Sequence, residues 1–225
     1  MSRKRIGIIT PASDTVIEVD FARHFAGPIT VHTARMYLES TTVKGETKML
    51  EEEVDPAVRR IAQVAPEVIV FGCTSASALL GLEGEKRLVR RMESLSGCPC
   101  LTITGAAVNQ LKKSGIRDLM VLTPYLPEIN RRLEGTFQAA GLPVTYIAGM
   151  GLDSDRTIGN IEPEEIIAFV RKHFSRAWAD GIFLSCTTLR ALETVEQLQA
   201  ELGVPVLTSN AVAIAEVEKI LNREL

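Results

Sequence analysis

The chain alternates short apolar runs with longer segments in which apolar residues recur at helical spacing. The first run, residues 5–10, is a continuous β-branched stretch typical of a strand buried on both faces of a parallel sheet. Comparable runs predict strands at 29–36, 68–71, 100–103, 119–122, 144–148, 182–184 and 206–208. Helices are predicted at 16–25, 55–65, 74–97 with breaks at Gly81 and Gly84, 106–114, 127–140, from 163 onward, 194–202 and 211–222. The polar stretches 39–48 and 153–159 are predicted to be loops.

This alternation is repeated within the chain. EVIVFGCTSAS around Cys73 is echoed by DGIFLSCTTLR around Cys186, and the two cysteines are 113 residues apart. The Thr-Pro pairs of IGIITP and LMVLTP have the same separation. We therefore expect an α/β fold of two similar Rossmann-like lobes with parallel sheets, related by pseudo-twofold symmetry. Residues 1–105 with 209–225 are predicted to form the lobe carrying Cys73, and residues 106–208 the lobe carrying Cys186.

Charge and composition exclude several classes of partner. A formal net charge of −3, with acids and bases scattered along the chain, leaves no basic stripe for a nucleic acid. The apolar run near the N-terminus is too short for a signal peptide or a membrane span. We expect a cytoplasmic protein with reduced thiols and no membrane partner. A homo-oligomer is also expected, although the sequence does not fix the oligomeric state.

Metal and phosphate chemistry lack a supporting motif. The three histidines, His24, His32 and His173, are not spaced as a pair on one helix face. Cys98 and Cys100 form a CxC without a second pair of ligands, so structural thiols are expected there. No glycine-rich phosphate loop is present. The sequence therefore predicts neither a metal nor a cofactor.

Cys73 and Cys186 each follow a predicted strand and precede a predicted helix. Ligands bind at the carboxyl ends of parallel strands, so the cleft between the lobes is expected to bring both thiols to one active site. A helix N-terminus lowers the pKa of a thiol and binds carboxylates. Two such thiols can act as opposed acid and base, or as nucleophile and proton donor, on a small carboxylate substrate. The alternative is that both are small buried hydrophobic residues.

The doubled strand-Cys-Thr unit, the two Thr-Pro loops and the stretch PASDTVIEVD resemble the aspartate/glutamate racemase superfamily, in its branch of maleate cis-trans isomerases and arylmalonate decarboxylases. The resemblance covers essentially the whole chain and implies a cofactor-independent enzyme. For a maleate isomerase it implies that Cys73 is the nucleophile and Cys186 the acid/base. Arylmalonate decarboxylases keep only the second cysteine, so the presence of Cys73 argues against that activity.

The resemblance also implies substrate-binding residues. Tyr125 and Asn160 match positions that hold the substrate carboxylates, and the hydroxyl residues behind the cysteines, Thr74, Ser75 and Thr187, are expected to assist. On sequence alone, Tyr125 can equally be an exposed loop tyrosine, and Asn160 a helix cap. Maleate isomerases carry asparagine where this chain has Asp14.

A carboxylate at position 14 repels a dicarboxylate, so a substrate with a hydrogen-bond donor is expected there, unless Asp14 only caps the following helix. The function expected first is maleate cis-trans isomerase-like. A two-base amino acid or hydantoin racemase, an arylmalonate decarboxylase-like enzyme and a non-catalytic small-molecule binding protein are the alternatives.

Overall fold

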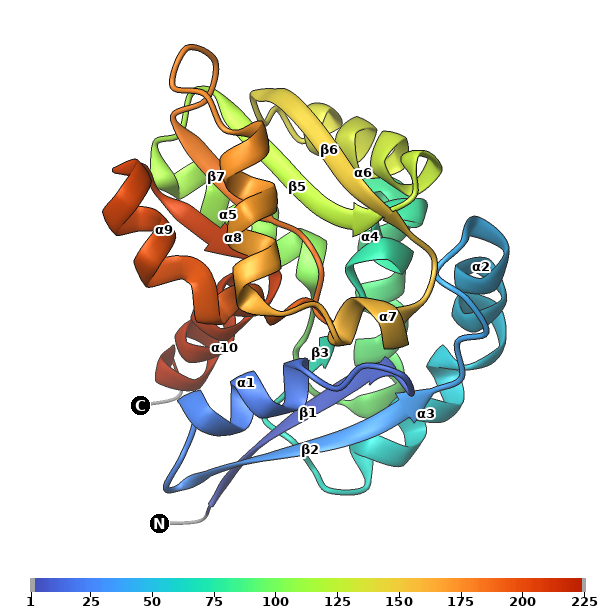
Figure 1. The fold of residues 1–225 in the computed structure, drawn as a ribbon. Helices are drawn as coiled ribbons and strands as arrows, with labels where there is room; N and C mark the ends of the chain where they lie inside the picture. The colour runs from blue at the N-terminus through green and yellow to red at the C-terminus, as the bar shows by residue number, and fades with distance from the viewer. Residues whose placement is uncertain (1–2, 224–225) are drawn as a thin grey trace.

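The computed structural model describes residues 3–223, which form two four-stranded parallel sheets with flanking helices (Figure 1). The first sheet has the order β2-β1-β3-β4 and the second the order β6-β5-β7-β8, so corresponding strands occupy corresponding places. The strands are β1 (Lys4–Pro11), β2 (Ile29–Met36), β3 (Val68–Phe71), β4 (Cys100–Thr102), β5 (Leu119–Tyr125), β6 (Val144–Leu152), β7 (Gly181–Leu184) and β8 (Val206–Thr208). The predicted α/β class with two Rossmann-like parallel sheets is confirmed.

Helices connect these strands and cover both sheets. They are α1 (Ile17–His24), α2 (Val43–Glu52), α3 (Val54–Ala62), α4 (Thr74–Ser96), α5 (Ile103–Ser114), α6 (Pro127–Ala139), α7 (Asp155–Gly159), α8 (Pro163–His173), the 3₁₀ helix η1 (Arg190–Thr194), α9 (Val195–Leu202) and α10 (Ser209–Arg223). Gly115 ends α5 in the left-handed region with φ 77°, the expected cap. The breaks predicted in α4 are half right, because the helix kinks at Gly81 with φ 61° and continues through Gly84.

Both segments predicted as polar loops contain helices. The stretch 39–48 includes the start of α2, where the Thr42 hydroxyl accepts a hydrogen bond from Gly45 N at 3.2 Å and so caps the helix. The stretch 153–159 includes α7, whose buried residues are Asp155 and Ile158. Both predictions were wrong because each helix is short and buries an acidic side chain, so its hydrophobic pattern is weak.

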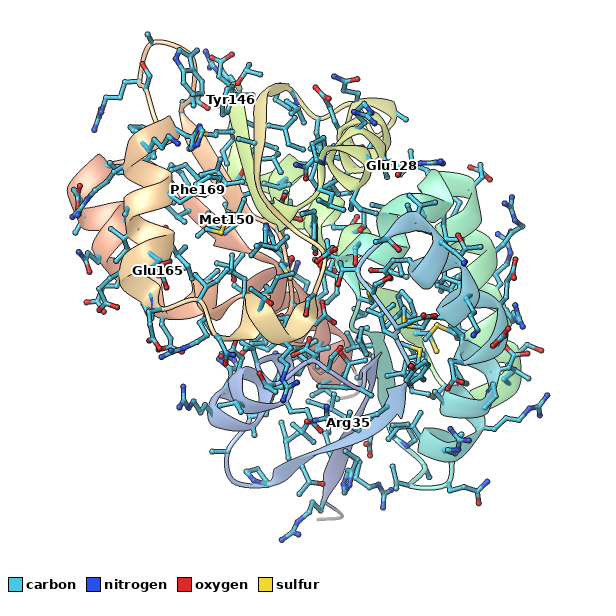
Figure 2. The ribbon with its side chains drawn as sticks, turned by 45° about the vertical axis from the view of Figure 1, so that its right-hand side comes forward. Arg35, Glu128, Tyr146, Met150, Glu165 and Phe169 are labelled. Carbon is cyan, nitrogen blue, oxygen red and sulfur yellow. The ribbon has the colours of Figure 1, made fainter. Side chains whose placement is uncertain are left out.

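Each sheet has its own hydrophobic core. The last helix, α10, packs Ala213 and Val217 with Ile6 and Ile8 of β1, so the end of the chain returns to the first sheet. In the second half, Phe169 of α8 and Tyr146 and Met150 of β6 pack against the core of the second sheet (Figure 2). The division of the chain into two lobes at residues 105 and 208 stays a prediction.

Helices between the sheets share a further core. Ala78 of α4 and Ala107 of α5 pack with Phe137 of α6 and Phe183 of β7. The short helix α7 lies between the two sheets, at the end of β6 and close to β1 (Figure 1). The carboxyl ends of β1, β3, β5 and β7 are therefore held around one region.

Candidate active site

Cys73 and Cys186 follow corresponding strands, β3 and β7, and both are 3% exposed. Cys73 is the N-cap residue of α4, as predicted. Cys186 differs from the prediction, because a turn follows it and the next helix, η1, begins only at Arg190. The N–H of Thr188 in this turn still donates to the Cys186 sulfur and acts to lower its pKa.

One hydrogen bond joins the two cysteine loops. The Thr187 hydroxyl, next to Cys186, donates to the carbonyl oxygen of Gly72, next to Cys73, at 3.4 Å. The same carbonyl accepts from the Thr10 hydroxyl at 2.8 Å, at the end of β1. The ends of β1 and β3 and the loop after β7 are thus fastened together, which places both thiols in one site.

The Cys73 thiol lies against an acidic side chain from α2. Its Sγ donates to Glu46 Oε2 at 3.4 Å and lies 3.5 Å from Ser75 Oγ, while the Ser75 hydroxyl donates to Glu46 Oε1. Burial raises the pKa of Cys73 well above its usual value, and the carboxyls of Glu46 and Asp155 raise it further. The N–H of the helix start at Ala76 lowers this pKa but does not outweigh burial. The thiol is therefore protonated in the resting site, contrary to the expectation of a lowered pKa.

Tyr125 is the partner of the second thiol. It is the last residue of β5 and 1% exposed, so the alternative of an exposed loop tyrosine was wrong. Its hydroxyl donates a hydrogen bond to Cys186, which lowers the thiol pKa, although burial leaves that pKa raised overall. Burial raises the pKa of Tyr125 well above its usual value, and electrostatic interactions with Cys186, Cys73 and Glu46 raise it further. Tyr125 is placed to stabilise a thiolate at Cys186.

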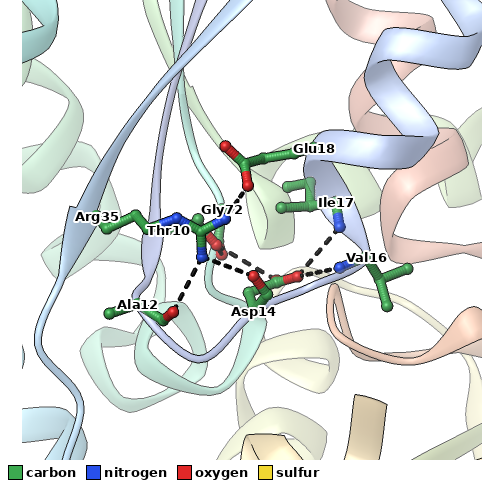
Figure 3. A network of polar contacts seen from close by, with 8 residues as sticks. All are labelled: Thr10, Ala12, Asp14, Val16, Ile17, Glu18, Arg35 and Gly72. Atoms are coloured by element: carbon green, nitrogen blue, oxygen red, sulfur yellow. Dashed lines mark hydrogen bonds and ion pairs between the residues drawn. The ribbon is translucent and has the colours of Figure 1, made fainter. Parts of the chain in front are cut away.

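Asp14 is buried in a network of donors (Figure 3). Its Oδ1 accepts from the backbone N–H groups of Val16 at 2.8 Å and Ile17 at 3.1 Å, and its Oδ2 from the Thr10 hydroxyl at 3.3 Å. Arg35 Nη1 donates to the Asp14 carbonyl oxygen at 2.8 Å and so fixes the loop. Burial raises the carboxyl pKa, and hydrogen bonds from the N–H groups of Val16 and Ile17 and from the side chains of Thr187 and Thr188 oppose the rise. The carboxylate thus performs the helix-start role given above as the alternative.

The remaining predicted binding residues differ in position. The Thr74 hydroxyl is buried, 3.1 Å from the hydroxyl of Ser209. Asn160 is exposed at the end of α7 and lines a surface hollow with Ile161 and Glu165. The structure thus brings Asp14, Ser75, Tyr125 and Thr187 close to the cysteines, whereas Asn160 lies on the outside of α7.

Glu46 is not among the predicted site residues, nor are three further residues that link α7 to the first half of the chain, Ser13, Thr41 and Asp155. The Thr41 N–H donates to the Asp153 carbonyl oxygen at 2.8 Å, and the Thr41 hydroxyl donates to Asp155 Oδ1 at 2.9 Å. The Ser13 hydroxyl donates to Asp155 Oδ2 at 2.9 Å. These bonds form a latch, defined here as Thr41, Asp155 and Ser13, between the first lobe and α7. Because both cysteines are buried, a ligand reaches them only when part of the surrounding structure moves.

Residues 3–223 contain no group of three or more His, Cys, Asp or Glu side chains placed to hold a metal ion. Among the helices described, none is long and apolar enough to cross a membrane.

Comparison with known proteins gives one family. The arylmalonate decarboxylase family model matches residues 6–224. Arylmalonate decarboxylase of Bordetella bronchiseptica is 29% identical over 93% of this chain and 87% of its own length. Maleate isomerase of Geobacillus stearothermophilus is 24% identical over 97% and 92%. A cysteine-to-serine mutant of Nocardia farcinica maleate cis-trans isomerase, with a covalently bound succinylcysteine intermediate, superimposes with a TM-score of 0.90 at 21% identity, covering 97% of this chain and 93% of that one. The chain therefore belongs to the arylmalonate decarboxylase family.

Proposed function

We propose that this protein is a cofactor-independent isomerase that uses Cys73 and Cys186 on a small carboxylate substrate, in the manner of a maleate cis-trans isomerase. The observation that carries the proposal is the pairing of two buried thiols at corresponding strand ends, joined by the bond from Thr187 to Gly72. Relatives named as maleate isomerases support the class, and the succinylcysteine of the Nocardia enzyme supports covalent addition by a cysteine.

The chemistry divides between the two thiols. The Cys73 sulfur gives its proton to a base in the site and adds to one alkene carbon, forming a C–S bond, while the proton of Cys186 passes to the other carbon. The former double bond is then single and rotates. Cys186 takes the proton back and the C–S bond breaks, which releases the trans alkene. Tyr125 assists by donating to the Cys186 sulfur while it is a thiolate.

The groups proposed to hold the substrate carboxylates are neutral donors. The hydroxyls of Thr74 and Ser75 lie in the first turn of α4, and that of Thr187 lies in the loop after β7. Each has a partner within the protein. Substrate binding exchanges these bonds for bonds to the substrate. Asn160 joins them only if α7 turns inward.

A second candidate, a two-base racemase of an amino acid or hydantoin, is favoured by the acids in this site. Asp14, Glu46 and Asp155 are all buried, and burial raises the pKa of each carboxyl. Whichever of these carboxyls is ionised repels the two carboxylates of maleate and attracts a protonated amino group. In a racemase, Cys73 and Cys186 are opposed bases and form no adduct.

Decarboxylation of an arylmalonate and simple ligand binding are the remaining alternatives. The presence of Cys73 disfavours decarboxylation of an arylmalonate. A protein that only binds a ligand does not need two thiols at matched positions. The proposal places the enzyme in the cytoplasm without a nucleic acid partner. Its subunit number, with a homo-oligomer as the expectation, can be measured by light scattering.

Turnover of candidate substrates tests the proposal. The wild-type protein is incubated with maleate, single enantiomers of amino acids, hydantoins and an arylmalonate, and the products are followed by proton NMR in D₂O. An isomerase converts maleate to fumarate, and both Cys73→Ala and Cys186→Ala abolish this conversion. Turnover that survives in Cys73→Ala contradicts the two-thiol mechanism. Deuterium exchange at the α-carbon of an amino acid identifies the racemase instead.

A further inference from the structure

The Cys73 thiol has one base within hydrogen-bond distance. Glu46 Oε2 accepts from Sγ at 3.4 Å, and the other polar neighbour, Ser75 Oγ, lies at 3.5 Å. The Ser75 hydroxyl itself donates to Glu46 Oε1, so its proton is already committed to the same carboxylate. Glu46 is therefore the group in position to receive the thiol proton.

The start of α2 fixes Glu46 in this position. Thr42 caps the helix, and any side chain at Gly45 would collide with the carbonyl oxygen of Ser40. The preceding residue, Thr41, is held to α7 by its two bonds to Asp153 and Asp155. Glu46 is consequently 0% exposed and faces Cys73 through backbone constraints, rather than through a freely rotating surface side chain.

Electrostatics favour transfer within this pair. Ionising the thiol alone adds a buried charge, which burial opposes. Passing the proton from Sγ to a carboxylate only moves one negative charge from oxygen to sulfur. Burial raises the pKa of Glu46 to about 8, which is close to the working pH at which a general base is most effective.

We propose that Glu46 is the general base for Cys73, taking the thiol proton onto Oε2 as the sulfur forms its bond to the substrate. The S–H bond breaks and an O–H bond forms, and the sulfur electron pair becomes the new C–S bond. The proton returns to sulfur when the C–S bond breaks. This inference rests on the proposed function, in which Cys73 is the nucleophile.

Other titratable groups around Glu46 set the pH at which it acts. Asp155 of α7 raises its pKa, and Tyr125 of β5 interacts with it electrostatically. Cys73, at the start of α4, lowers its pKa through the hydrogen bond. Asp55 lies on α3, which also packs against α2, and is engaged in an ion pair of its own. The interactions that shift the Glu46 pKa do not include one with a cation.

Alkylation of Cys73 by iodoacetamide tests the inference without a known substrate, because the thiol loses its proton as iodide leaves. The rate is measured by peptide mass spectrometry in the Cys186→Ser protein, from about pH 6 to about pH 10. With Glu46 present, the rate should rise as the carboxyl ionises near pH 8. In Glu46→Gln the rate near that pH should fall about tenfold or more, and the inflection should vanish. Glu46→Asp, which keeps a base, should recover part of the rate.

Glu85→Gln is the matched control. Glu85 is also buried, accepts a hydrogen bond from a serine, Ser77, at 2.6 Å, and has its pKa raised to about 7. It does not contribute to the pKa shift of Cys73, so its loss should leave alkylation unchanged. Equal or faster alkylation in Glu46→Gln overturns the proposal, because Glu46 would then only raise the thiol pKa. Turnover retained by Cys73→Ala is a separate result, which defeats the proposed function and not the Glu46 effect on the thiol.

Discussion

Thr187 donates a hydrogen bond to the Gly72 carbonyl oxygen at 3.4 Å, joining two residues that each adjoin a candidate catalytic cysteine. Asn210 supports this bond, because its side-chain amide donates to the Thr187 carbonyl oxygen at 3.0 Å and to Asp20 at 2.7 Å. The two sheets therefore hold the cysteine loops at a fixed separation. A mechanism that passes a substrate between two thiols requires such a separation.

Removing a hydrogen bond of the latch should make the site open more easily. Thr41→Val removes the hydroxyl that donates to Asp155 at 2.9 Å and leaves a buried carboxyl oxygen with one donor fewer. The loss should cost the closed state about 1 kcal/mol and so raise the ratio of open to closed protein about fivefold. Hydrogen exchange in α2 and α7 should accelerate at the same time. The control is Thr145→Val, which removes a 2.8 Å bond to the Trp178 carbonyl oxygen away from the latch. Equal hydrogen exchange rates in α2 and α7 for both variants would contradict the role of the latch.

Substitutions of Asp14 distinguish a structural role of this residue from a role in substrate binding. Asn retains an oxygen acceptor for the N–H groups of Val16 and Ile17, so Asp14→Asn should keep the stability of the protein, whereas Asp14→Ala should lose about 1–2 kcal/mol. Denaturant unfolding measures both. If Asp14 also accepts a bond from the substrate, Asp14→Asn weakens the native substrate and improves maleate. Unchanged kcat/KM for every compound tested would leave only the helix-start role.

The raised pKa of Glu46 predicts that the free energy of unfolding decreases as pH rises. Its pKa is 4.5 in the unfolded chain and about 8 in the folded one, so between these values the folded protein binds the extra proton. This contribution is fully present below pH 4.5 and is lost as pH rises toward about 8. Unfolding free energies at both ends of this interval should differ less in Glu46→Gln than in the wild type. Asp20 and Glu85 titrate in the same range, so only the difference between the two proteins reports on Glu46. Identical pH dependence in both would disprove the assignment.

Tyr125→Phe should slow proton transfer from Cys186 to the substrate. The ring is fully buried and phenylalanine fills the same space, so the fold should hold, while Cys186 loses its hydroxyl donor. We expect kcat to fall about tenfold to a hundredfold with little change in KM, because the lost bond matters when Cys186 is a thiolate. The Cys186 pKa should also rise. A change in KM alone would instead assign Tyr125 to carboxylate binding.

The internal repeat made much of the fold predictable. Buried β-branched runs recur at matched positions, and the rule for parallel sheets then places Cys73 and Cys186 at strand ends. The pairing of the lobes could be anticipated for the same reason. Element ends were less certain: β5 extends to Tyr125, three residues beyond the predicted end, which explains why Tyr125 is buried.

Glu46 and Asp155 could not be found from the sequence. Each lies in a polar stretch, where an acidic residue normally faces water. Their burial depends on partners far along the chain, 27 residues away for Glu46 and Cys73, and 114 for Thr41 and Asp155. The sequence feature that could have predicted the start of α2 is Thr42 followed by the apolar Val43, and this pattern alone is weak evidence for a helix. Asn160 is the opposite case: the family resemblance predicted it as a binding residue, but in the structure it is exposed.

Covalent trapping on Cys73 distinguishes the proposed isomerase from a racemase or a binding protein. The Cys186→Ser protein lacks the thiol proposed to remove the proton from the adduct, so an adduct protonated by solvent should persist. It is incubated with maleate and digested, and the mass of the peptide that contains Cys73 is measured by mass spectrometry. A succinyl adduct on Cys73, absent from Cys73→Ala, is the predicted result. An unmodified Cys73 together with conversion of maleate by the wild-type enzyme would contradict nucleophilic attack by this cysteine.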